Sequence, residues 1–143
     1  MARHRPTAPV LIVDDNPEVR EALGALLESD GYRTVAAADG RDALDFLRRA
    51  EVLPSLVLLD LMMPLVDGWD FRAAQSRDAR LAGIPVIVVS AHPLASLARN
   101  TGAAAVITKP ADPETLLAAV ERHCAKDPES EWAAADLNRG PAD

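Results

Sequence analysis

Residues 10–17 read VLIVDDNP, in which four apolar residues are followed by two carboxylates, an asparagine and a proline. An uninterrupted apolar run of this length is typical of a strand that is buried on both faces of a parallel sheet. Asn16 suits the N-cap of a helix and Pro17 suits its first position, so a helix is expected to follow at once. The stretch therefore predicts a strand, a short turn that carries Asp14 and Asp15, and a helix.

The same order of strand and helix repeats along the chain. Short apolar runs predict five strands, at residues 10–13, 34–37, 56–59, 86–89 and 105–108. Apolar residues at helical spacing predict a helix after each strand. The first starts at about Pro17, the second is marked by Ala43 to Ala50, the third starts near Asp67, the fourth spans about 93–100, and the last is capped by Asp112. Strict alternation predicts an α/β fold, a doubly wound five-stranded parallel sheet with helices on both faces.

The size and composition fit one globular domain, with 143 residues of which 49% are hydrophobic and 26% charged. The alternating strand and helix pattern covers residues 9–126, which we interpret as the domain. We expect a flexible N-terminus at residues 1–8 and an acidic, disordered tail at residues 127–143. A net charge of −7 argues against a direct nucleic-acid partner, and a single cysteine excludes an intrachain disulfide. No segment resembles a signal peptide or a membrane span, so we expect a cytoplasmic protein with no membrane partner.

The polar residues that end the predicted strands indicate the chemistry. Asp14 and Asp15 follow the first strand, Asp60 the third, Ser90 the fourth and Lys109 the fifth. The carboxyl ends of parallel strands lie at one edge of a sheet, so these side chains are expected to meet there. Neighbouring carboxylates repel each other unless a cation neutralises them, and Mg²⁺ prefers oxygen ligands. A carboxylate can also attack phosphorus, so the set predicts a magnesium-dependent phosphoryl acceptor.

These residues stand in motifs that occur in a fixed order. The motifs are VLIVDDN at 10–16, LVLLDLMMP at 56–64, Gly68, VVSA at 88–91, Gly102-Ala103 and Thr108-Lys109-Pro110. Over about residues 8–125 the chain resembles the response-regulator receiver domains of two-component signalling, of the stand-alone, single-domain type. The resemblance implies a flavodoxin-like (βα)5 receiver fold and a phosphorelay switch, which is a signal-transduction module rather than a turnover enzyme.

The resemblance also assigns the acceptor and the metal. Asp60 resembles the phosphoacceptor, which forms an aspartyl phosphate. Asp15 would bind Mg²⁺ directly and Asp14 through water, with Asp60 and the backbone carbonyl of Met62 as further ligands. Mn²⁺ would substitute for Mg²⁺. The implied phosphodonor is a histidine kinase or a histidine phosphotransfer protein, and the implied output is altered binding of a downstream protein partner.

Further groups are expected around the phosphoryl group. Ser90 resembles the hydroxyl residue that moves onto the phosphoryl group, and Lys109 resembles the lysine that pairs with it. The family builds the bond between this lysine and the following proline as a cis peptide, a form that X-Pro bonds adopt at modest cost. The residues that flank the site are Met62, Ala91, His92 and Pro110.

Two departures from the family pattern concern the output. The family commonly has an aromatic residue three positions before the lysine, where this chain has Val106. The segment from Ser90 to Lys109 is also about three residues shorter than usual, around the expected fourth helix. Both departures predict that phosphorylation is retained while its readout is atypical.

Three other functions are alternatives to a phosphoryl-accepting switch. A phosphorylation-independent receiver-like interaction module is favoured by Val106 and opposed by the full acidic set and Lys109. A phosphatase with an aspartyl intermediate would need a second Asp where Met62 stands. A nucleotide-binding domain would need a Gly-rich phosphate loop after the first strand. The sequence leaves open the identity of the partners and whether the protein forms a homodimer.

Overall fold

The computed structural model describes residues 5–61, 67–91 and 102–125 of the chain. The elements in chain order are β1 (Val10–Val13), α1 (Pro17–Ser29), β2 (Thr34–Ala37), α2 (Gly40–Arg49), β3 (Leu56–Leu59), α3 (Gly68–Arg77), β4 (Val86–Ser90), β5 (Ala105–Thr108) and α4 (Pro113–His123). The five predicted strands are confirmed, and β4 extends one residue further than predicted, to Ser90. The helix expected at 93–100 and the tail at 127–143 lie outside the described residues.

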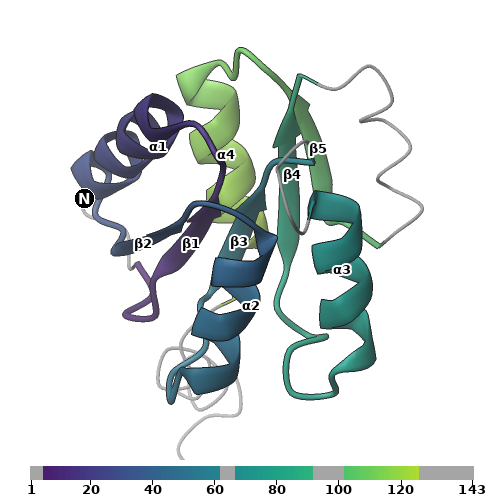
Figure 1. The fold of residues 1–143 in the computed structure, drawn as a ribbon. Coiled ribbons are helices and arrows are strands. Elements are labelled where there is room, and N and C mark those ends of the chain that lie inside the picture. The colour runs from purple at the N-terminus through teal and green to yellow at the C-terminus, as the bar shows by residue number, and fades with distance from the viewer. Residues whose placement is uncertain (1–4, 62–66, 92–101, 126–143) are drawn as a thin grey trace, which may run out of the picture.

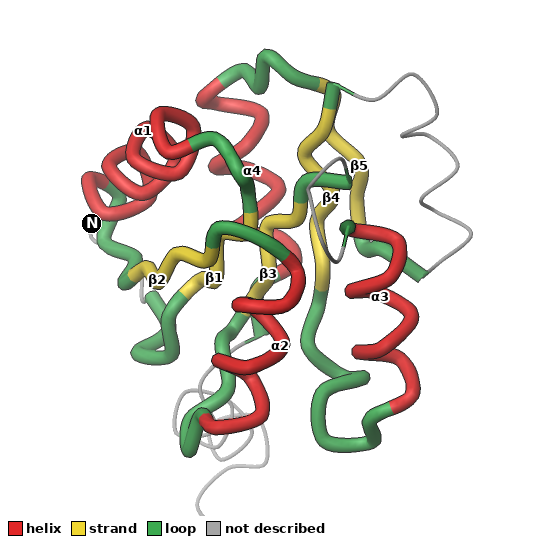
Figure 2. The backbone as a smooth tube through the Cα atoms, in the orientation of Figure 1, coloured by secondary structure: helices red, strands yellow, loops and turns green. Residues whose placement is uncertain are grey.

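The five strands form one parallel sheet in the order β2-β1-β3-β4-β5, and helices cover both of its faces (Figures 1 and 2). Helices α1 and α4 lie on one face, and α2 and α3 lie on the other (Figure 1). The order changes direction beside β1, because the chain first adds β2 on one side and then adds β3 on the other. The doubly wound fold predicted from the sequence is therefore confirmed, and ligands of such sheets bind at the carboxyl ends of the strands.

Two separate cores, one on each face, hold the layers together. Alternate residues of β1 serve different cores: Leu11 and Val13 pack towards α2 and α3, and Val10 and Ile12 pack towards α1 and α4. All four are at most 1% exposed, which explains why the strand is apolar throughout instead of alternating with polar residues. Each face buries one apolar stripe from its helices against the sheet.

The helices begin where the sequence supplies a capping side chain. Asn16, as predicted, accepts hydrogen bonds from the backbone amides of Glu18 and Val19 at the start of α1. Asp112, as predicted, caps α4 by accepting from the Thr115 amide at 3.0 Å. The other two described helices also begin at aspartate caps, Asp39 for α2 and Asp67 for α3. These caps satisfy amides that have no partner within the helix.

The N-terminal segment reaches the domain at Arg5. Its guanidinium forms an ion pair with the Asp30 carboxylate at 2.8 Å and lies over the Tyr32 ring, 4.7 Å from the ring centroid. The sequence placed Arg5 in the expected flexible segment 1–8, and residues 1–4 lie outside the described part of the chain. Arg5 thus packs against the turn that joins α1 to β2.

One glycine allows α3 to approach the end of β3. The Gly68 amide donates to the Leu61 carbonyl at 3.1 Å. A Cβ at Gly68 would lie 2.4 Å from the Asp60 carbonyl oxygen and 2.6 Å from the Leu61 Cα. Both atoms belong to the backbone, so only glycine fits without displacing the segment that carries Asp60.

Replacing Gly68 with alanine is expected to destabilise the fold by about 1–3 kcal/mol, the usual range for overpacking a close contact. Urea unfolding followed by circular dichroism would measure the change. Gly83→Ala is the matched control, because a Cβ at Gly83 would meet no atom within 4 Å. Its effect should stay within about 0.5 kcal/mol. Equal stability of the two variants would contradict the close approach at Gly68.

The single tyrosine gives a direct reading of stability at high pH. Burial raises the pKa of Tyr32 to about 12, although the Arg5 cation opposes the shift. Because the folded state holds the phenol neutral and the unfolded pKa is about 10, stability is expected to fall as the pH rises from about 10 to about 12. Phenolate absorbance should titrate near the higher value in the native protein. Tyr32→Phe should lose the decline between these pH values, and an unchanged decline would contradict the assignment.

Candidate functional site

Three carboxylates meet at the carboxyl end of the sheet. Val13 and Leu59 are register partners on the neighbouring strands β1 and β3, so Asp14 and Asp60, which follow them, lie side by side. Oxygen atoms of Asp14, Asp15 and Asp60 all lie within 4.8 Å of one another. Asp14 is 2% exposed and Asp60 is 6% exposed, whereas Asp15 faces solvent. The cluster is therefore open to an incoming ligand on the side of Asp15.

The ammonium group of Lys109 neutralises part of this charge. Its Nζ lies 2.5 Å from Oδ2 of Asp14 and 3.6 Å from Oδ2 of Asp60. Lys109 follows β5, and its amide donates to the Ser90 carbonyl at 3.1 Å, which fixes the end of β5 to the end of β4. The Lys109–Pro110 peptide bond is cis, as the resemblance implied. Three acids and one lysine leave the cluster with an excess of negative charge.

Asp14 is held from three directions. Beside the lysine contact, its Oδ1 accepts from the Asn16 amide at 2.9 Å. Its backbone carbonyl accepts from Nη1 of Arg20 at 2.7 Å. Arg20 stands in the second turn of α1, and the sequence reasoning missed it because that reasoning followed only the apolar positions of this helix. No signal in the sequence singles out Arg20, because the contact depends on how α1 lies beside the turn that carries Asp14.

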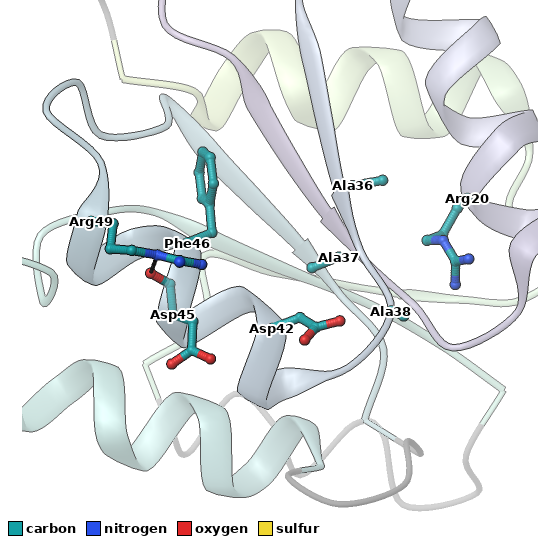
Figure 3. A pocket seen from close by; sticks show the side chains of 8 residues that line it. All are labelled: Arg20, Ala36, Ala37, Ala38, Asp42, Asp45, Phe46 and Arg49. Carbon is teal, nitrogen blue, oxygen red and sulfur yellow. Dashed lines mark hydrogen bonds between the residues drawn. The ribbon is translucent and has the colours of Figure 1, made fainter.

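Arg20 also borders a hollow beside the site. The hollow has a volume of about 370 Å³ and lies between α1 and α2 at the end of β2. Figure 3 shows Arg20 on one side and Asp42 and Asp45 on the other, with small alanine side chains between them. These alanines, Ala36 to Ala38, leave room above the edge strand. Charges of both signs line the hollow, so its walls favour neither anions nor cations.

Ser90 and Ala91 stand at the end of β4. Ser90 is fully buried and is the register partner of Thr108, the residue before Lys109. Ala91 is exposed and, with Lys109 and Pro110, borders a largely apolar groove of about 410 Å³ against α1. The sheet therefore brings a hydroxyl residue and the lysine to the same edge as the three acids.

Most of the predicted site residues lie together at this edge. Asp14, Asp15, Asp60 and Lys109 form one cluster, and Ser90, Ala91 and Pro110 border it. Met62 and His92 lie outside the described residues. Val106 lies on β5, half-buried, in contact with an apolar cluster built on Leu61 and Val88. The structure thus places Val106 behind the site, on the strand that leads to Lys109.

The donor set suits a hard divalent cation. It offers carboxylate oxygens from three residues and no nitrogen or sulfur ligand among the described residues. Such a set matches Mg²⁺, which binds few carboxylates and keeps several waters. A bound cation would relieve the repulsion among the acids and could also bind a phosphoryl oxygen. The cluster of acids and the lysine can therefore hold both a metal ion and a phosphoryl group.

Comparison with known proteins shows the family of the chain. The sequence matches the family described as the response regulator receiver domain over residues 10–121. It is 38% identical over 121 residues to the response regulator Rre1 of Synechocystis, which covers 82% of this chain and 52% of that protein. Protein PilH of Pseudomonas aeruginosa is 35% identical over 113 residues, 77% of this chain and 92% of PilH. The chain thus spans about half the length of Rre1 and nearly all of PilH.

Solved structures give the same result. A response regulator receiver protein from Pseudomonas putida matches with a TM-score of 0.75 and 32% identity, over 84% of this chain and 98% of that chain. The chemotaxis protein CheY4 of Vibrio cholerae matches with a TM-score of 0.73 and 30% identity, over 82% and 98%. The chain belongs to the response regulator receiver domain family.

Membership in this family places the chain in two-component signalling. Receiver domains accept phosphate from histidine kinases and are phosphoacceptor signalling modules rather than turnover enzymes. The acidic triad is typical of the magnesium site of receivers. Among the described residues, no helix has the length and apolar character needed to cross a membrane.

Removing the lysine charge is expected to strengthen metal binding. Lys109→Met removes the ion pair with Asp14, so Mg²⁺ no longer competes with the lysine ammonium for this carboxylate. Mg²⁺ should therefore bind about tenfold more tightly, which corresponds to about 1.4 kcal/mol of binding free energy. Isothermal titration with Mg²⁺ would measure the affinity. Arg122→Met is the control for net charge, because Arg122 is an exposed cation in the last turn of α4. Equal or weaker Mg²⁺ binding in Lys109→Met would show that the ion pair does not compete with the metal.

Proposed function

We propose that the protein is a phosphorylation switch in which Asp60 accepts a phosphoryl group from a histidine kinase or a histidine phosphotransfer protein. The observation that carries the proposal is the placement of the Lys109 ammonium between Asp14 and Asp60, with Asp15 beside them. A carboxylate nucleophile, a fixed cation and a set of metal ligands are the groups that phosphoryl transfer requires. The family assignment supports the same reaction.

In the proposed reaction an oxygen of Asp60 attacks phosphorus. A P–O bond to Asp60 forms while the P–N bond to the donor histidine breaks, and the bonding pair returns to the histidine nitrogen. Negative charge spreads over the three equatorial oxygens, so charge stabilisation provides most of the catalysis. Lys109 would pair with one of these oxygens and Ser90 would donate its hydroxyl to another. Nζ of Lys109 already lies 3.6 Å from Oδ2 of Asp60. Ser90 would move from its buried position at the end of β4 onto the phosphoryl group.

The metal in this proposal is Mg²⁺, with Mn²⁺ as a substitute. Asp15 and Asp60 would bind it directly, Asp14 would act through water, and the carbonyl of Met62 would complete the protein ligands. When bound, the ion neutralises the acids and polarises the phosphoryl group. The exposure of Asp15 supports a direct role for that residue, since the metal would enter from the solvent side.

The proposed output is a change in binding of a downstream protein. Phosphorylation of Asp60 would shift an equilibrium between two conformations of the domain. The small Val106 side chain stands where the family commonly has an aromatic residue, so the proposed output uses other contacts. The same observation favours a second candidate, a receiver-like interaction module that works without phosphorylation.

The two candidates differ in the behaviour of Asp60. Incubation with Mg²⁺ and a small acyl-phosphate donor should add one phosphoryl group to the wild-type protein, as intact mass would show. Asp60→Asn and removal of Mg²⁺ with EDTA should each abolish the adduct, because they remove the nucleophile and the metal. Asp45→Asn is the matched control, since Asp45 is exposed on α2, and it should be phosphorylated normally. An unmodified wild-type protein would favour the phosphorylation-independent module.

A further inference from the structure

A third apolar cluster lies apart from the two main cores. Leu61 and Val88 are its buried members, and Trp69, Ala103 and Val106 pack against them. Three of these residues are close in sequence to site residues. Leu61 follows Asp60 directly, Val88 precedes Ser90 by two positions on β4, and Val106 precedes Lys109 by three positions. The cluster therefore underlies all three strand ends that carry the acceptor, the hydroxyl and the lysine.

Trp69 belongs to the part of α3 that touches the acceptor segment. It follows Gly68, whose amide donates to the Leu61 carbonyl at 3.1 Å and which leaves no room for a Cβ against the Asp60 carbonyl. The backbone next to the indole is thus in van der Waals contact with the backbone of Asp60 and Leu61. Any displacement of that backbone at Asp60 would move the start of α3 as well.

The same face of α3 reaches the beginning of β5. Arg72 stands three residues after Trp69, and residues at this spacing lie on one face of a helix. The Nη2 atom of Arg72 lies 3.0 Å from the position that a Cβ of Gly102 would occupy, and Gly102 has a positive φ of 85°. Burial lowers the pKa of the Arg72 guanidinium, whose Nε has no hydrogen-bond partner among the described residues. Arg72 of α3 therefore lies against Gly102, and Trp69 of α3 packs against the same two buried residues, Leu61 and Val88, as Ala103 and Val106 do.

Val106 is in turn fixed to the interior of the sheet. It is the register partner of Val88, which is 1% exposed and packs in the same cluster. The Trp69 ring, which packs against the same Leu61 and Val88, is a large, rigid body with only two side-chain torsions. Packed interiors respond to a displacement by switching between arrangements instead of deforming continuously. A change at Leu61 would thus be passed to β5 through the packing of Trp69 and Val106 on Leu61 and Val88.

We infer that Trp69 is a positioning residue that couples the phosphorylation state of Asp60 to the conformation of β5. It touches no phosphoryl oxygen and acts through the backbone of Asp60 and Leu61 at the start of α3 and through the side chains of Leu61 and Val88, against which Val106 also packs. The inference rests on the proposed phosphorylation of Asp60 and adds the route by which that event reaches β5 on the sheet edge. It also accounts for a β5 that carries valine, because the aromatic ring in this packing comes from α3.

The first experiment uses the indole as a reporter. The chain has two tryptophans, so Trp132→Phe leaves Trp69 as the only one. Fluorescence of this variant is recorded with Mg²⁺ alone and with Mg²⁺ plus beryllofluoride, which mimics the phosphoryl group on a carboxylate. The emission of Trp69 should change on adding beryllofluoride. The same variant with Asp60→Asn should show no change, and an unchanged emission with Asp60 intact would overturn the inference.

The second experiment measures the coupling itself. Amide hydrogen exchange of residues 105–108 is compared with and without Mg²⁺ and beryllofluoride in the wild type, Trp69→Leu and Trp69→Phe. The wild type and the conservative Phe variant should change their exchange rates by at least about fivefold, the lower end of coupling between linked sites. Trp69→Leu should lose this change. Phe46→Leu is the matched control, a half-buried aromatic residue of α2 in a different cluster, and should keep it.

Intact mass after treatment with the acyl phosphate tests the proposed phosphorylation of Asp60 separately from the inferred role of Trp69. An adduct on Trp69→Leu together with loss of the β5 response supports the inference. An adduct together with a response equal to that of the wild type overturns it and leaves the proposed function standing. No adduct on the wild type would remove the proposed function and the inference with it. Val106→Ala truncates the side chain that β5 contributes to this cluster and should reproduce the loss if Trp69→Leu does not fold.

Discussion

The register between β1 and β3 is the constraint on which the site depends. Val13 and Leu59 pair in parallel, and the Asp60 amide donates to the Val13 carbonyl at 2.9 Å, so two carboxylates emerge side by side at one edge. Both are almost fully buried, which would be unfavourable for two negative charges without compensation. The sheet order β2-β1-β3-β4-β5 supplies that compensation, because it brings Lys109 from the end of β5 to the same edge. Backbone pairing therefore brings two buried negative charges together and also places the lysine that neutralises part of them.

The hydrogen bonds around Asp14 show how the edge is prepared before any ligand arrives. Its carboxylate is held by the Asn16 amide and Lys109, and its carbonyl is held by Arg20. Asn16 serves twice, since its side chain also caps α1. A turn held by so many contacts keeps the acids in position, and fixed groups contribute more to charge stabilisation than mobile ones. The first strand, its turn and its helix thus act as one unit.

Helix α3 packs closely both against the segment that carries Asp60 and against the main core. Its first residue, Gly68, abuts the backbone of Asp60. In its first turns, Trp69 packs against Leu61 and Val88, and Arg72 lies against Gly102, just before β5. The other side of the helix is anchored in the main core by Phe71, which is fully buried. A helix with one face fixed in the core and another face between two functional segments can transmit a displacement with little loss.

The sequence by itself determined the strands, the caps of α1 and α4 and the membership of the acidic cluster. Apolar runs such as residues 10–13 and 56–59 show their own ends, because each is bounded by charge, and caps such as Asn16 and Asp112 act on neighbours three residues away. The edge position of Asp14, Asp60 and Lys109 followed from parallel topology alone. Only the tertiary structure decided that Lys109 lies closer to Asp14 than to Asp60, that Arg20 holds the Asp14 carbonyl, and that Trp69 and Val106 pack against the same buried pair, Leu61 and Val88. Sequence patterns report each element's own period and ends, whereas these contacts depend on how separate elements pack together in three dimensions.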